Sequence, residues 1–183
     1  SQSNPSIDSL KQYISKAETD REKFDLFLLL SSEYHFSYPD SAIYFAKQAK
    51  DLALGINDTD LTTRVYYELA LITKETGDFE VANEYGLQAL ILAERKQNKD
   101  MMAKSNLILG HISALQIEYD KARVYYKNCM SLCKELGNTK GEAFAYVGIG
   151  NIEYYSDSLD KAKNYFGQAV SLIDTVNNSV GLA

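Results

Sequence analysis

The sequence predicts an all-α fold built from four helical hairpins and an N-terminal capping helix. One pattern recurs four times in the 183-residue chain at a constant spacing of 40 residues. Within each copy, the recurring apolar positions have the spacing of one helix face. The chain also contains only two prolines, so long helices meet few interruptions.

The second helix of each hairpin, which we call helix B, is marked by an alanine at every fortieth position. Three, seven and ten residues later stand an aromatic residue, a small residue and a leucine. These offsets place all four side chains on one helix face, so we expect that face to be buried. The four columns are Ala42, Ala82, Ala122 and Ala162; Phe45, Tyr85, Tyr125 and Tyr165; Ala49, Ala89, Cys129 and Ala169; and Leu52, Leu92, Leu132 and Leu172.

The first helix of each hairpin, helix A, carries its own column twelve residues before the alanine of helix B. A short turn joins the two helices, as at residues 76–79. Gly77 can adopt the left-handed conformation that ends a helix, and Asp78 can cap the next one. Asn106 stands where the other units have leucine or tyrosine, so we expect the third unit to pack less well there.

Each end of the chain carries a segment outside the four hairpins. Apolar residues at helical spacing predict a capping helix over residues 5–18, beginning near Pro5. We expect one domain over residues 5–183, with units at about 20–57, 58–97, 98–137 and 138–177. The last six residues, 178–183, match the start of the fourth unit, so they are expected to begin a truncated fifth one. The chain would then be a fragment of a longer protein; a frayed natural C-terminus is the alternative.

These units resemble the tetratricopeptide repeat, in which a bulky residue, leucine, glycine and an aromatic are followed by alanine, aromatic and alanine. The resemblance covers about residues 23–176, and the best-matching unit is YVGIGNIEYYSDSLDKAKNYFGQAVSLI. It implies a right-handed α-α superhelix of stacked hairpins, a solenoid. The period of 40 exceeds the usual 34 or so and is similar to that of kinesin light chains and of Rap regulators that sense peptides.

A second resemblance concerns YPDSAIYFAKQAKDLA at residues 38–53. It is similar to the first repeat of extracytoplasmic domains in bacterial signalling proteins, which continue into a membrane helix and a histidine kinase or a LuxR-type transcriptional regulator. The resemblance implies a sensory domain on the extracytoplasmic side, after a removed signal peptide. A cytoplasmic scaffold and a Rap-like peptide-responsive regulator remain alternatives.

The composition argues against several other functions. The net charge is −6 and there is no lysine- or arginine-rich run, so we expect no direct nucleic-acid contact. No apolar run reaches the roughly 18–20 residues that span a membrane, so attachment would need a downstream segment. Cys129 and Cys133 are expected to be buried thiols. Neither the two histidines nor GIGNIE at 148–153 has the spacing of a metal or nucleotide site, so no metal, cofactor or catalytic residue is predicted.

The resemblance to tetratricopeptide repeats implies a concave side lined by helix A, which binds a protein or peptide. Phe24 and Ser31 fall on this line in the first unit. Tyrosine and arginine on such a surface are good anchors for a partner. The exposed C-terminal unit could also mediate self-association. The predicted binding residues are Phe27, Arg64, Tyr67, Leu71, Lys74, Lys104, His111, Asn151 and Tyr154.

Overall fold

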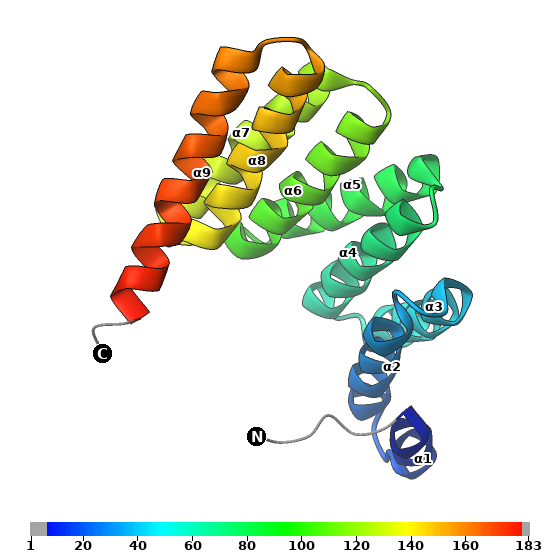
Figure 1. The fold of residues 1–183 in the computed structure, drawn as a ribbon. Coiled ribbons are helices and arrows are strands. Elements are labelled where there is room, and N and C mark those ends of the chain that lie inside the picture. The colour runs from blue at the N-terminus through cyan, green and yellow to red at the C-terminus, as the bar shows by residue number, and fades with distance from the viewer. Residues whose placement is uncertain (1–6, 181–183) are drawn as a thin grey trace. The chain divides into compact units, whose positions relative to one another are not determined.

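The computed structural model describes residues 7–180, which form nine α-helices and no strand (Figure 1). The predicted all-α class is confirmed. The helices are α1 (Ile7–Lys16), α2 (Asp20–Tyr34), α3 (Pro39–Ile56), α4 (Thr59–Glu75), α5 (Phe79–Arg95), α6 (Lys99–Leu115), α7 (Tyr119–Leu136), α8 (Thr139–Tyr155) and α9 (Leu159–Val180). The even-numbered helices are the predicted A helices, and α3, α5, α7 and α9 are the B helices.

Local side-chain chemistry sets the helix boundaries. Thr19 and Glu22 form a capping box at the start of α2, which satisfies backbone N–H groups that lack helical partners. The carboxylate of Asp58 accepts hydrogen bonds from the backbone N–H groups of the first turn of α4. Between α4 and α5, Gly77 has a φ of +83° and Asp78 accepts a bond from the N–H of Val81, as predicted.

The alanine column of helix B forms the tightest part of the core. Ala42, Ala82 and Ala122 are completely buried, and Ala162 is nearly so. Small side chains allow helices A and B to approach closely, and neighbouring aromatic residues fill the remaining space. Tyr66 of α4 stacks on Tyr85 of α5, with 5.9 Å between ring centroids. The burial of this column confirms the face assigned from the 40-residue spacing.

The third unit lacks the corresponding aromatic stack. Asn106 takes the place of Tyr66 and Tyr146 and is buried. Its side-chain Nδ2 donates to the carbonyl of Met102 at 2.8 Å, but Oδ1 has no partner among the described residues. A buried acceptor without a hydrogen bond is destabilising. The expected weak point in the third unit therefore coincides with an unsatisfied polar atom.

The contacts of the chain fall into two compact units, which we call unit 1 (Ser1–Leu92) and unit 2 (Ala93–Ala183). In unit 1 the core is formed by α2, α3 and α4 around Phe24 and Leu69. In unit 2 it is formed by α6 to α9 around Tyr126 and Ile149. The arrangement over 5–183 as one domain stays a prediction.

The C-terminal segment differs from the sequence expectation. The helix α9 runs without a break to Val180, so residues 178–180 continue it instead of beginning a fifth unit. Asn177 stands at the register position where Asn57 and Gly137 have positive φ and end the preceding B helices. At those sites a capped A helix follows the turn. At the start of α8, for example, the Asn138 side chain accepts a hydrogen bond from the backbone N–H of Gly141. Residues 181–183 lie outside the described range.

Candidate functional site

The A-helix face of unit 1 comprises the sides of α2 and α4 that do not pack against α3. Phe27 is half-buried and stacks on Phe45, with 6.1 Å between ring centroids. Phe24 and Ser31 are fully buried, so their predicted place on this face is wrong. The Ser31 hydroxyl donates to the carbonyl of Ala42 at 3.0 Å, which the close approach of α2 to the alanines of α3 permits. On α4 the face carries Arg64, Tyr67, Leu71 and Lys74.

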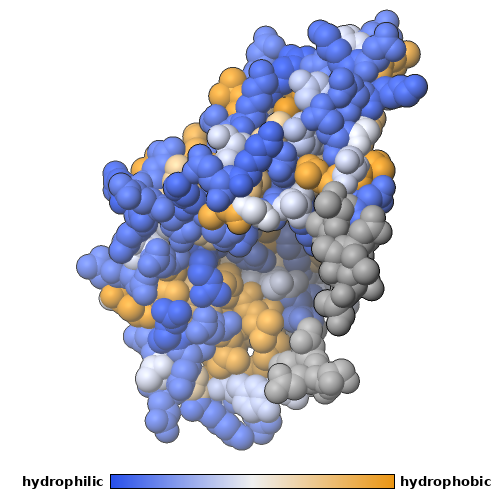
Figure 2. All heavy atoms as spheres, turned by 90° about the vertical axis from the view of Figure 1, so that its left-hand side faces the viewer, coloured by the Kyte–Doolittle hydropathy of each residue, from blue (hydrophilic) through white to orange (hydrophobic). Residues whose placement is uncertain are grey.

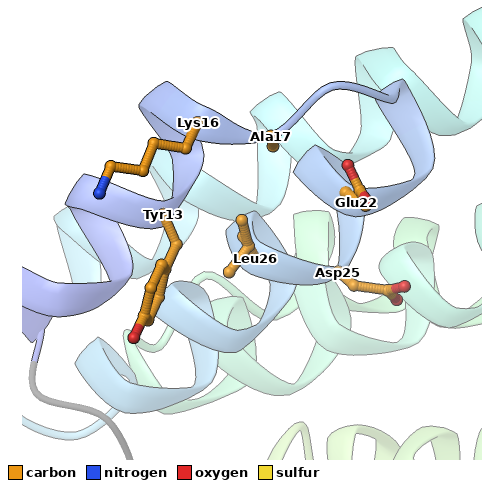
Figure 3. Close-up of a pocket in the computed structure, with 6 residues that line it drawn as sticks. All are labelled: Tyr13, Lys16, Ala17, Glu22, Asp25 and Leu26. Carbon is orange, nitrogen blue, oxygen red and sulfur yellow. The ribbon is translucent and has the colours of Figure 1, made fainter.

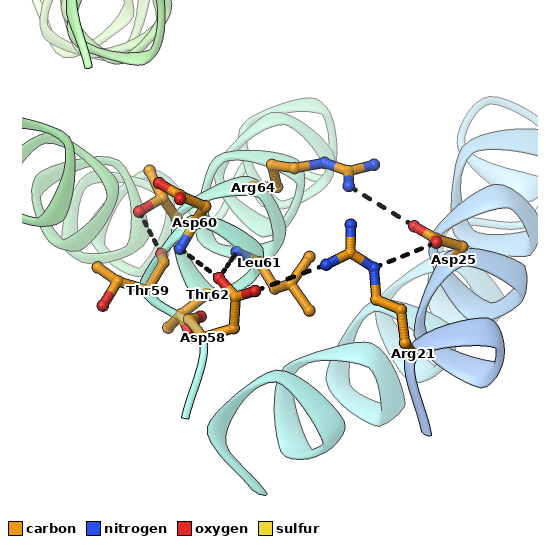
Figure 4. A network of polar contacts seen from close by, with 9 residues as sticks. Arg21, Asp25, Asp58, Thr59, Asp60, Leu61, Thr62 and Arg64 are labelled. Atoms are coloured by element: carbon orange, nitrogen blue, oxygen red, sulfur yellow. Dashed lines mark hydrogen bonds and ion pairs between the residues drawn. The ribbon is translucent and has the colours of Figure 1, made fainter. Parts of the chain in front are cut away.

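The cations of this face are already paired with carboxylates. The Arg64 guanidinium lies 3.6 Å from Asp25 Oδ1 (Figure 4). It also sits over the Phe24 ring. Arg21 lies between Asp25, at 3.4 Å, and Asp58, at 3.5 Å. Such exposed ion pairs contribute only about 0–1 kcal/mol each. Arg64 can therefore exchange Asp25 for a carboxylate of a ligand at little energetic cost.

A pair of titratable side chains at the edge of this face was not predicted from the sequence. His35 Nδ1 lies 3.9 Å from Glu68 Oε1, and both side chains are largely buried. Burial raises the pKa of the Glu68 carboxyl, and burial also lowers the pKa of the His35 imidazole. The sequence does contain a signal, because Glu68 stands in a column that holds Leu28, Ile108 and a glycine in the other units.

A shallow hollow of about 400 Å³ lies between α1 and α2 (Figure 3). Leu26 and Ala17 line it, and Tyr13 forms one wall. The carboxylate of Glu22 is also at this hollow, but it accepts hydrogen bonds from the backbone N–H groups of Glu18 and Thr19. Glu22 is thus engaged in capping α2, Asp25 is paired with Arg21 and Arg64, and the hollow is open to solvent.

The A-helix face of unit 2 is more accessible. Phe144 is 48% exposed and Tyr154 is 57% exposed on α8, and Asn151 lies between them. On the neighbouring helix α6, Lys104 is exposed but bound to Asp100 at 2.7 Å. Apolar and polar groups therefore alternate along two adjacent helices. The face consists of Lys104, Leu107 and His111 on α6 and Phe144, Val147, Asn151 and Tyr154 on α8.

A buried tyrosine from a B helix packs against the two helices that carry this face. Tyr126 of α7 is packed against Gly110 of α6 and Gly148 of α8, where a Cβ atom would be 2.7 Å and 2.4 Å from its ring. The absence of side chains at these glycines lets the ring enter between the two A helices. His111 contacts the Tyr126 ring edge to face, with 5.5 Å between centroids. The orientation of His111 is thus set partly by the core.

The described residues contain few groups suited to chemistry. Cys129 and Cys133 are buried and reduced, with 3.8 Å between their sulfur atoms, as the sequence indicated. Burial raises the pKa of both thiols, which disfavours a reactive thiolate. Among these residues no three His, Cys, Asp or Glu side chains are placed to hold a metal ion.

The face drawn in Figure 2 is mainly hydrophilic and is interrupted by apolar side chains. Within residues 7–180, no helix combines the length and hydrophobicity required to cross a membrane.

Residues 1–85 match the family described as the SusR N-terminal TPR domain. Over the described residues the fold is that of TPR-like helical repeat proteins. No curated protein sequence matches it.

Several solved structures share the tetratricopeptide-repeat fold of this chain. Aspartyl phosphate phosphatase F from Bacillus subtilis aligns over 96% of this chain and 47% of its own, with a TM-score of 0.86 and 19% identity. MamA aligns over 94% and 89%, with a TM-score of 0.68 and 22% identity. A Rap protein complexed with Competence and Sporulation Factor aligns over 92% and 49%, with a TM-score of 0.77 and 18% identity. The chain thus spans about half the length of the phosphatase-named relative.

Proposed function

We propose that this chain is a binding module whose tetratricopeptide repeats hold a peptide or a protein segment along the A-helix faces. The observation that carries the proposal is the open face of unit 2, where Phe144 and Tyr154 are exposed on both sides of Asn151. Aromatic side chains with polar neighbours are good anchors for a partner. The similar fold of a Rap protein complexed with Competence and Sporulation Factor supports a binding role over a catalytic one.

The chemistry of each A-helix face, taken by itself, suits an extended segment with apolar and acidic side chains. Leu107 and Val147 offer apolar contact, and the Asn151 amide can bond to the backbone of an extended chain. Arg64 and Lys104 can exchange their weak intramolecular ion pairs for ligand carboxylates. We expect micromolar affinity, because a flexible segment loses conformational entropy when it is ordered.

We further propose that the module is the sensory or interaction domain of a larger bacterial signalling protein, on the extracytoplasmic side of a membrane. The resemblance of residues 38–53 to histidine kinases and LuxR-type regulators supports this context. The match of residues 1–85 to a domain described as N-terminal is in keeping with it. A Rap-like peptide-responsive regulator is the second candidate, favoured by the TM-score of 0.86 to aspartyl phosphate phosphatase F.

The binding proposal can be tested with peptides selected from a random phage-displayed library against the purified chain. Phe144→Ala should weaken binding of the selected peptides at least about tenfold if Phe144 is an anchor, measured by fluorescence anisotropy. Because Phe144 is half exposed, the variant should keep the wild-type circular dichroism spectrum. The matched control is Val170→Ala, which shortens an exposed apolar side chain on a different helix, α9. Unchanged affinity of a folded Phe144→Ala variant would place the binding site elsewhere.

A further inference from the structure

The two turns that join helices A and B in unit 2 expose a group of apolar side chains. We call this group the turn patch. It consists of Leu115 and Ile117 at the α6–α7 turn and Tyr154, Tyr155 and Leu159 at the α8–α9 turn. Each of the five is between 54% and 72% exposed. Both turns lie at the upper end of unit 2 as drawn in Figure 1.

Ion pairs hold the two turns beside each other. Glu153, which directly precedes Tyr154, accepts a hydrogen bond of 2.9 Å from Arg123 Nε on α7. Nη1 of the same guanidinium lies 2.9 Å from Asp120, three residues after Ile117. The Glu153 side chain is only 9% exposed, and a charge-assisted hydrogen bond to a buried carboxylate is stronger than one in solvent. The Arg123 guanidinium therefore links the start of α7, beside the first turn, to the end of α8, beside the second.

Ile117 is poorly suited to its backbone conformation. Its φ is +64°, in the left-handed region, where Gly77 and Asp157 occupy the equivalent positions of other repeats. Glycine and aspartate tolerate this region, but a β-branched side chain there is strained. Ile117 is also 72% exposed, so burial of its side chain does not offset the strain. The fold would be better served by a small or polar residue.

The turn of the second repeat shows that this geometry does not require apolar residues. It has Glu75 and Gly77 where the third repeat has Leu115 and Ile117. Both turns are nevertheless closed by the same type of bond, from the N–H of Asp78 to the carbonyl of Thr73, and from Glu118 to Ser113. The apolar side chains of unit 2 therefore do not serve the turn itself.

Charge around the turn patch indicates what covers it. Asp120 is fully exposed, and Asp157 and Asp160 are exposed without an ion-pair partner among the described residues. Of the lysines near the patch, Lys121 on α7 is bound to Glu118 at 2.9 Å, and Lys161 and Lys163 are exposed on α9. We propose that the turn patch docks a protein segment that presents apolar side chains beside lysine or arginine. This surface lies at the turn end of the repeats and shares Tyr154 with the A-helix face of unit 2, whereas its other four residues lie outside that face.

The proposal can be tested with two designed probes and one substitution. The probes are an amphipathic 14-residue peptide of leucine and lysine, and the same peptide with glutamate at each lysine. Titrated into the ¹⁵N-labelled chain, the lysine peptide should shift amide resonances of residues 115–120 and 154–160, and the glutamate peptide should not. Ile117→Asn should reduce the affinity for the lysine peptide at least tenfold.

The same substitution has a second readout that separates loss of contact from misfolding. Asparagine tolerates the left-handed region, so Ile117→Asn should raise the Tm by about 2–4 °C. Val170→Asn, an equal change at an exposed site of α9, should leave the affinity unchanged. Shifts spread over the whole surface, or equal binding of both peptides, would overturn the proposal. Self-association of the chain that Ile117→Asn abolishes, seen by analytical ultracentrifugation, would also overturn it by making a second copy the occupant.

Discussion

Replacing Gly148 by alanine should destabilise unit 2, whereas the same replacement at Gly167 should stabilise it. Both glycines lie inside helices, so both variants gain the same helix propensity, about 0.8–1.0 kcal/mol. The two sites differ in what the added methyl group would meet. At Gly167 nothing lies within 4 Å of the new Cβ.

At Gly148 the new Cβ would lie 2.4 Å from Cζ and 2.5 Å from Cε1 of Tyr126. Carbon atoms in contact are about 3.5–4.0 Å apart, so the ring would have to move by roughly 1 Å. It cannot move freely, because its other side is packed against Gly110. Overpacking of this kind costs about 1–3 kcal/mol, and the confined ring places this site at the upper end. After the propensity gain, the net loss is about 2 kcal/mol.

Urea unfolding followed by circular dichroism measures this difference directly. The free energies of unfolding of the two variants should differ by about 3 kcal/mol, Gly148→Ala being the less stable. Gly148→Ala should lower the free energy of unfolding less in a Tyr126→Leu background than in wild type, because the clash is with the tyrosine ring. Equal stabilisation by Gly148→Ala and Gly167→Ala would refute the packing of Tyr126 between α6 and α8.

Two further predictions concern buried positions. Burial raises the pKa of Glu68 above its ordinary value of 4.5, so its stabilising contribution is present below pH 4.5 and is lost as pH rises through the folded-state pKa. Glu68→Gln should therefore be more stable than wild type at pH 7. Thermal melts should show the Tm difference between variant and wild type shrinking toward pH 4. A Tm difference independent of pH would contradict a desolvated carboxyl. Ala122→Arg should cost more than about 2 kcal/mol, since it forces bulk and charge into a completely buried helix crossing. A melt within a degree of wild type would show that Ala122 is not at that crossing.

The sequence determined the helices and the buried side of each B helix. Helical periodicity and capping are local properties, so a repeat of 40 residues was enough to place Ala42, Ala82, Ala122 and Ala162 on one buried face. The turn at Gly77 and the buried thiols of Cys129 and Cys133 also followed from residue type and spacing. Family resemblance added the expectation of a binding face on helix A.

Only the tertiary structure decided which side chains of the predicted binding face are accessible. Phe24 lies on the same line as Phe27 in the sequence, but it is buried because α3 and α4 close over it. The pairing of Arg64 with Asp25, 39 residues earlier, and of His35 with Glu68 depends on helices brought together by packing. Exposure and charge state are set by neighbours from other helices, and these neighbours have no fixed spacing along the chain. The turn patch likewise depends on the tertiary structure, which leaves Ile117 both exposed and in the left-handed conformation.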